Sequence, residues 1–121
     1  MGMGDFFKIA ILIIAVCNTA NGQTFTKLSE NELAKQVIFT GLVLVDNQQT
    51  KNAIENENFR ELNIFLGENP SKPEVDMYTV AVIALHSLAV WWMPQRYRKS
   101  FQTFSLGVQS HTVWINYRVT Y

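Results

Sequence analysis

An apolar run near the N-terminus limits the size of the domain that this chain can form. Lys8 precedes the uninterrupted apolar residues 9–16, and small or polar residues follow as far as Gly22. A basic start, an apolar middle and small residues at a cleavage point are the three parts of an export signal. We therefore predict that residues 1–22 are a signal peptide, and that residues 23–121 form a single small helical domain after a cut before Gln23.

Two other interpretations of this leader stay open. It could remain as a membrane anchor, although the run is shorter than the roughly 20 apolar residues of a spanning helix. It could also be a lipoprotein signal with an acylated Cys17, although Val16 is larger than the residue usual at that place. Cleavage would remove Cys17, the only cysteine, and would leave 99 of the 121 residues without disulfide or thiol chemistry.

Three later segments carry helix signals. Ser29 and Glu32 form the pattern of a capping box, and an apolar stretch follows from Val37 to Val45, so a helix is predicted from there to about residue 53. A second helix is predicted over residues 77–93, which carry no charge, with Asp76 as its N-cap. A third is predicted over about 100–116, with an extended tail after it. We expect an all-α fold, a small three-helix bundle with a long ordered loop over residues 55–76, in which Gly67, Pro70 and Pro73 act as helix breakers.

The uncharged segment 77–93 fits either a core helix or a membrane span at the lower length limit. If 33–46 and 77–93 both crossed a membrane, the basic residues after Pro94 would lie on the exported side, against the positive-inside tendency. A peripheral domain is therefore preferred, with a spanning hairpin of 77–93 and 101–119 as the alternative. The predicted membrane-surface contacts are Trp91, Trp92, Arg96, Arg98 and Lys99.

Polar residues recur at intervals that bring them to one side of the predicted third helix. Gln102, Gln109 and Asn116 follow each other at seven-residue steps, so they lie on one helical face. This face is either exposed to water or part of an interior polar seam. The second interpretation predicts a binding or structural cluster of Asp46, Gln49, Thr50, Glu61, Asn63, His86, Gln109 and Asn116.

Motifs of catalysis are not found in the sequence. It has no phosphate-binding glycine loop, no nucleophile elbow and no His-Glu-x-x-His pair. We accordingly predict no catalytic residue, no metal and no cofactor. A metal-dependent hydrolase that uses Asp46, Glu61 and His86 remains an alternative function.

The order of short motifs resembles that of a known group of proteins. Asp46-x-x-Gln49-Thr50 is followed by Glu61-x-Asn63-x-x-Leu66-Gly67-x-x-Pro70, then by a helix with His86, by Pro94-x-Arg96-Tyr97-Arg98 and by Asn116. This order resembles a family of small uncharacterised exported envelope proteins of proteobacteria and their phages. The family often has Trp where this chain has Asn47, and Pro where it has Ile64. The resemblance therefore implies fold and location rather than chemistry.

These observations predict a non-catalytic, exported protein that is periplasmic or membrane-associated. Its expected role is that of an envelope or phage-associated accessory protein that binds a membrane surface or an envelope protein. A second copy of the chain is a further candidate partner. Nucleic acid is not expected to bind, because the formal net charge is zero.

Overall fold

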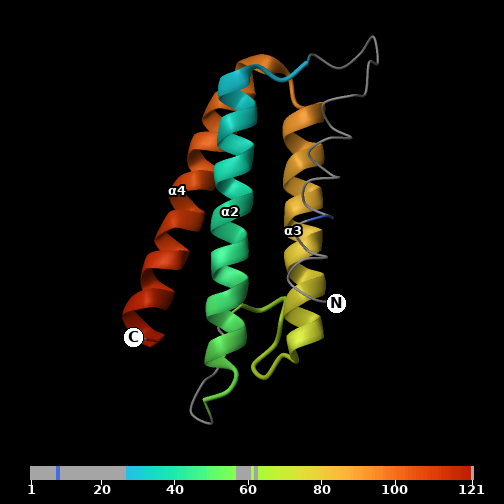
Figure 1. The fold of residues 1–121 in the computed structure, drawn as a ribbon. Coiled ribbons are helices and arrows are strands. Elements are labelled where there is room, and N and C mark those ends of the chain that lie inside the picture. The colour runs from blue at the N-terminus through green and yellow to red at the C-terminus, as the bar shows by residue number, and fades with distance from the viewer. Residues whose placement is uncertain (1–7, 9–26, 57–60, 62, 121) are drawn as a thin grey trace.

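The computed structural model describes residues 8, 27–56, 61 and 63–120, and this part of the chain forms three long helices. They are α2 (Glu30–Ala53), α3 (Lys72–Trp92) and α4 (Gln95–Thr120). The helices lie side by side with α2 between the other two, and α3 and α4 meet at the end where α2 begins (Figure 1). The prediction of an all-α three-helix fold is confirmed. The predicted signal peptide lies outside the described residues except for Lys8.

Helix α2 begins where its capping box predicts. The Ser29 hydroxyl accepts a hydrogen bond from the backbone N–H of Glu32, and the Glu32 carboxylate accepts one from the backbone N–H of Ser29. These bonds satisfy two N–H groups that have no partner within the helix. The helix continues without a break through Asp46 to Ala53, as expected.

Helix α3 begins five residues before the predicted start. Its N-cap is Ser71, which forms a second capping box with Glu74, and Pro73 lies in the first turn. We had interpreted Pro73 as a helix breaker, but proline is favoured in the first turn, where the missing N–H would have no partner. Asp76 is therefore a buried helical residue rather than the N-cap. The loop before α3 is correspondingly shorter than predicted.

The cap at Ser71 gives a first prediction. Replacing Ser71 with alanine should lower the free energy of unfolding by about 1 kcal/mol, because the first turn of α3 loses the acceptor for its N–H groups. Ser100→Ala, at an exposed site inside α4, serves as the matched control and should change stability by less than about 0.5 kcal/mol. Thermal unfolding followed by circular dichroism measures both variants. Equal stability of the two would contradict the capping role.

Helix α4 is longer than predicted at both ends. It begins at Gln95, directly after Pro94, and continues to Thr120, so residues 117–120 of the expected extended tail are helical. Apolar and polar residues alternate after Val113, a pattern that also fits a strand, but the described residues contain no neighbouring strand to pair with it. A strand needs such a partner for its backbone hydrogen bonds, whereas a helix makes them internally.

The turn between α3 and α4 is held by Arg98. This residue is 1% exposed, so its predicted role as a membrane-surface contact is wrong. Its Nε donates to the carbonyl oxygen of Val90 at 2.8 Å and its Nη2 to that of Trp91 at 2.9 Å. Its Nη1 lies 3.7 Å from the Glu32 carboxylate. Arg98 thus caps the end of α3 and joins it to the start of α2.

The apolar core is small for a bundle of this length. Phe39 and Val43 from α2 pack with Ile83 from α3, and Leu44, Val82 and Leu106 are partly buried against them. Most other buried side chains are polar, on both sides of this layer along the helices. The apolar layer therefore divides the polar interior into two parts.

Candidate functional site

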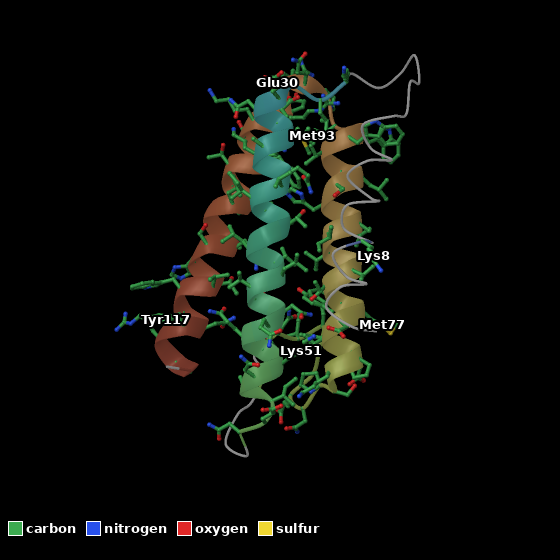
Figure 2. All side chains as sticks on the ribbon, in the orientation of Figure 1. Lys8, Glu30, Lys51, Met77, Met93 and Tyr117 are labelled. Atoms are coloured by element: carbon green, nitrogen blue, oxygen red, sulfur yellow. The ribbon has the colours of Figure 1, made fainter. Side chains whose placement is uncertain are left out.

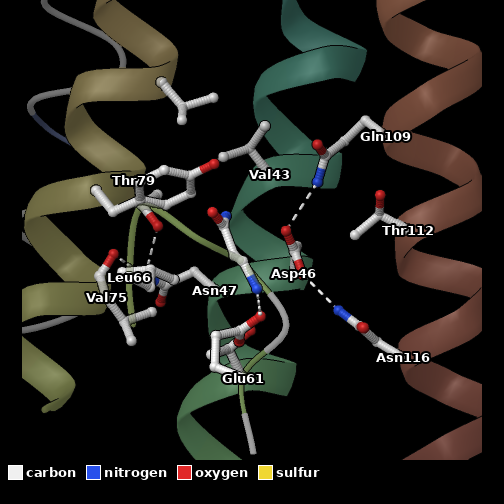
Figure 3. Close-up of a pocket in the computed structure, with 14 residues that line it drawn as sticks. Val43, Asp46, Asn47, Glu61, Leu66, Val75, Thr79, Gln109, Thr112 and Asn116 are labelled. Atoms are coloured by element: carbon white, nitrogen blue, oxygen red, sulfur yellow. Dashed lines mark hydrogen bonds between the residues drawn. The ribbon is translucent and has the colours of Figure 1, made fainter. Parts of the chain in front are cut away.

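A polar cavity of about 290 Å³ lies between the three helices, on the side of the apolar layer nearer the α2–α3 loop (Figure 3). All three helices and the loop contribute to its walls. The lining residues are Val43, Asp46, Asn47, Thr50, Glu61, Asn63, Leu66, Val75, Tyr78, Thr79, Val82, Gln109, Thr112 and Asn116. Five residues of the predicted polar cluster besides Asp46 are among them: Thr50, Glu61, Asn63, Gln109 and Asn116.

Asp46 forms the wall between α2 and α4. Its Oδ2 accepts a hydrogen bond from Nε2 of Gln109 at 3.1 Å, and its Oδ1 accepts one from Nδ2 of Asn116 (Figure 3). The seven-residue step between Gln109 and Asn116 places both amides on one side of α4, where they reach the same carboxylate. The interior interpretation of this polar face is therefore the correct one for these two residues. Gln102, one step earlier, is also buried and donates to the carbonyl oxygen of Glu32.

The α2–α3 loop contributes Glu61 and Asn63 to the cavity lining. Hydrogen bonds within the loop fix them: the Asn63 N–H donates to Oε1 of Glu61 at 2.9 Å, and Oδ1 of Asn63 accepts from the Phe65 N–H at 3.0 Å. The Asn63 carbonyl accepts from the N–H groups of Leu66 and Gly67. Gly67 has φ of 77°, a conformation that side chains disfavour, so glycine suits this turn. In the described part of the predicted ordered loop, residues 61 and 63–68 are therefore held in place beside the cavity.

Asn47 was not predicted as a site residue, yet it connects the cavity walls of α2 and α3. Its Nδ2 donates to Oγ1 of Thr79 at 2.9 Å and to Oδ1 of Asp76 at 3.1 Å. Lys51, one turn later, forms an ion pair with the same Asp76 oxygen at 3.0 Å. The sequence gives no clear signal for this role, because Asn47 is one of a run of polar residues over 46–52 and its partners Thr79 and Asp76 lie about 30 residues away.

Two members of the predicted cluster lie outside the cavity lining. Gln49 is buried against α4, where its Nε2 donates to the Val113 carbonyl at 3.3 Å. His86 belongs to a second polar group on the other side of the apolar layer. Its Nδ1 is 2.9 Å from Oε1 of Gln36, and Nε2 of Gln36 donates to the Ser87 hydroxyl at 2.9 Å.

The His86 ring is also held by aromatic stacking. Its centroid lies 3.7 Å from that of Phe39 and 5.1 Å from that of Phe101. Within the described residues, no three His, Cys, Asp or Glu side chains are placed to hold a metal ion. His86 does not meet Asp46 and Glu61, so the three residues of the hydrolase alternative do not form one site.

An exposed ion pair joins the end of α2 to the start of α3, outside the cavity lining. Lys72, the first residue of α3, hydrogen-bonds the carboxylate of Glu55, and this bond holds the pKa of Glu55 below its usual value. Both side chains are exposed, so solvent screens the pair and it contributes little to stability.

In the middle of α2 and α3, the exposed side chains are more apolar than the buried ones. In residues 36–50 of α2, every residue classed as exposed is apolar or glycine: Val37, Ile38, Gly41 and Val45. In residues 75–92 of α3 the exposed residues are Met77, Ala81, Leu85, Leu88 and Trp92. The side chains of Met77 and Tyr117, among those labelled in Figure 2, are both exposed. Soluble domains normally have the opposite arrangement, with apolar side chains inside.

Some of the predicted membrane-surface contacts at the α3–α4 turn are exposed, and others are buried. Trp92 is 77% exposed, and Arg96 and Lys99 are also exposed, whereas Trp91 is only partly exposed and Arg98 is buried.

Within the described residues, α3 is the one helix long and apolar enough to cross a membrane by length and composition. Buried helices of soluble proteins also meet that criterion, so the distribution of exposed residues is the stronger observation.

Comparison with known proteins finds no matching family model, no matching curated protein and no matching solved structure. Function is therefore inferred from the cavity and from the outer surface of the bundle.

Proposed function

We propose that this chain is a small integral membrane protein of the cell envelope, a non-catalytic accessory protein whose three helices lie within the bilayer and which acts by binding. The single observation that supports this proposal is the inverted distribution of side chains. Apolar residues cover the middle of α2 and α3 on the outside, while most buried side chains other than the layer of Phe39, Val43 and Ile83 are amides, hydroxyls, carboxylates and an imidazole. In lipid this arrangement is favourable, because the acyl chains contact apolar groups and the polar groups hydrogen-bond one another.

The dimensions of the bundle fit a bilayer. The helices contain 24, 21 and 26 residues, which corresponds to about 30–40 Å at 1.5 Å per residue. The hydrocarbon layer is about 30 Å thick. In α4, residues 100–117 carry no Asp, Glu, Lys or Arg. This uncharged segment supports a span in α4 as well, although Thr103, Ser110 and His111 are exposed on it and make its surface less apolar than those of α2 and α3.

The residues at the α3–α4 turn are consistent with helices that end at the surface of a bilayer. Trp92, Arg96 and Lys99 lie together at the α3–α4 turn, where an aromatic and basic group would contact lipid headgroups. The positive-inside argument against two spans had counted Arg98 as a third surface cation. Arg98 is buried and bonded to α3 and Glu32. Arg96 and Lys99 are therefore the surface cations at that turn that disfavour its placement on the exported side of the membrane.

Peripheral binding through the loop and the α3–α4 turn is the competing function, and alkaline carbonate extraction separates the two. An integral bundle should stay in the membrane pellet, whereas a peripheral domain should leave it. Recovery of the chain in the supernatant would contradict the proposal.

Cysteine labelling gives an independent test. In a Cys17→Ser background, Val45→Cys should resist a membrane-impermeant maleimide in intact membranes and react after detergent denaturation, because Val45 would face lipid. Asn69→Cys, in the exposed loop, is the matched control. It should react without detergent denaturation when the maleimide has access to both faces of the membrane. Equal reaction of the two cysteines would show that the outside of α2 contacts water.

Export itself, cleavage before Gln23 and membership of the envelope family remain proposals. N-terminal sequencing of the mature protein tests the first two. A start at Gln23 supports a cleaved signal, and a start at Met1 contradicts it. Cleavage leaves α2, α3 and α4 intact, so the membrane proposal does not depend on this result.

A further inference from the structure

Among the described residues that line the polar cavity, two carry carboxylates and none carries a cationic side chain. Asp46 comes from α2 and Glu61 from the loop, and the lining of described residues includes no lysine, arginine or histidine. Lys51, one turn after Asn47, forms its ion pair with Asp76 instead. Negative charge in a partly enclosed site is unfavourable unless a positive group offsets it.

The partners of Asp46 stabilise its charge without cancelling it. Gln109 and Asn116 each donate one neutral amide N–H to a different oxygen of the carboxylate. A carboxylate accepts about four hydrogen bonds, so each oxygen retains a lone pair for a further donor. The two amides also fix the position of the carboxylate, which makes it a prepared acceptor.

The volume and the apolar walls indicate an organic ligand rather than a bare ion. The cavity of about 290 Å³ is far larger than the roughly 30 Å³ that one water occupies in the liquid. Val43, Leu66, Val75 and Val82 provide apolar contacts beside the carboxylates. A cavity with apolar walls and a few placed polar groups is typical of small-molecule sites.

We propose that this cavity binds the primary ammonium group of a small amine, which donates N–H hydrogen bonds to the carboxylates of Asp46 and Glu61. The carbon chain of the amine packs against the valine and leucine side chains. The ammonium group can come from a free amine or from the aminoethyl headgroup of a lipid. The lipid source rests on the proposed membrane role, whereas binding of a free amine does not.

Calorimetric titration of the purified full chain in detergent with 2-aminoethanol tests the site, with ligand-observed NMR in parallel. We expect saturable binding of one molecule. Asp46→Asn and Glu61→Gln should each weaken it at least about tenfold, because a charge-assisted hydrogen bond is lost. Glu55→Gln, an exposed carboxylate outside the cavity, is the matched control and should bind as the unmodified chain does. Choline, whose nitrogen has no N–H, should bind at least about tenfold more weakly.

Circular dichroism shows whether Asp46→Asn and Glu61→Gln are folded. If one of them is unfolded, the binding measured for the other tests the proposal. No binding of 2-aminoethanol to the folded chain, or equal binding by a folded Asp46→Asn or Glu61→Gln variant, overturns the proposal. Equal affinity for choline also overturns it. In nanodiscs, competition by phosphatidylethanolamine but not by phosphatidylcholine would support the lipid source, and absence of competition would support a free amine. If the chain resists carbonate extraction but binds no amine, only the amine-binding inference is refuted. If the chain is extracted by carbonate but binds the amine, only the membrane role is refuted.

Discussion

Replacing Arg98 with methionine is expected to lower the free energy of unfolding by about 3 kcal/mol or more. Arg98 is the most buried cation of the described residues, and its guanidinium bonds two carbonyl oxygens at the end of α3. Methionine keeps an unbranched apolar stem but supplies no donor. The Glu32 carboxylate and the carbonyls of Val90 and Trp91 would then be buried with fewer partners, and removing one member of a buried charged pair typically costs about 3–5 kcal/mol.

Lys99→Met is the matched control for this substitution. It removes a positive charge from the adjacent residue, which is exposed, and should change stability by less than about 0.5 kcal/mol. Denaturation of the purified protein in detergent, followed by circular dichroism, compares the two variants. Similar stability of the two would mean that Arg98 does not hold the turn between α3 and α4.

The sequence is informative about helices where local signals agree. The capping box at Ser29 and the apolar run after it correctly predict α2, because both features act within a few residues of each other. The start of α3 was missed although Ser71 and Glu74 form the same pattern, since Pro73 was interpreted as a breaker. The end of α4 was missed because alternation and helical spacing both fit its last residues, and only the absence of a pairing strand among the described elements decides between them.

The candidate site is less accessible to sequence reasoning, because its contacts join distant residues. Seven-residue spacing correctly places Gln109 and Asn116 on one side of α4, and the position of Asp46 after an apolar run marks it as partly buried. Nothing local separates His86 from this cluster. The separation arises from the apolar layer of Phe39, Val43 and Ile83, which forms only when α2 and α3 pack together. The role of Arg98 is hidden for the same reason, since a basic run after Pro94 is typical of a solvated turn.

Replacing Leu85 with arginine is expected to have opposite consequences in a membrane bundle and in a soluble one. Leu85 is 68% exposed and lies near the middle of α3. In water, arginine at such a position should alter stability by less than about 0.5 kcal/mol and improve solubility. In a bilayer the same side chain would replace leucine in the hydrocarbon layer, at a cost of about 3 kcal/mol. We therefore expect Leu85→Arg to reduce sharply the amount of chain that resists carbonate extraction.

Ile64→Arg is the matched control, because Ile64 is also an exposed apolar residue, at 87%, but lies in the α2–α3 loop. An arginine there can reach the headgroups or water, so the extracted fraction should be unchanged. Immunoblots of the pellet and supernatant compare both variants with the unmodified chain at equal expression. If Leu85→Arg and Ile64→Arg behave alike and the chain remains folded, the apolar surface of α3 faces water. The exposed apolar residues of α2 and α3 would then need a cover other than lipid, such as a second copy of the chain.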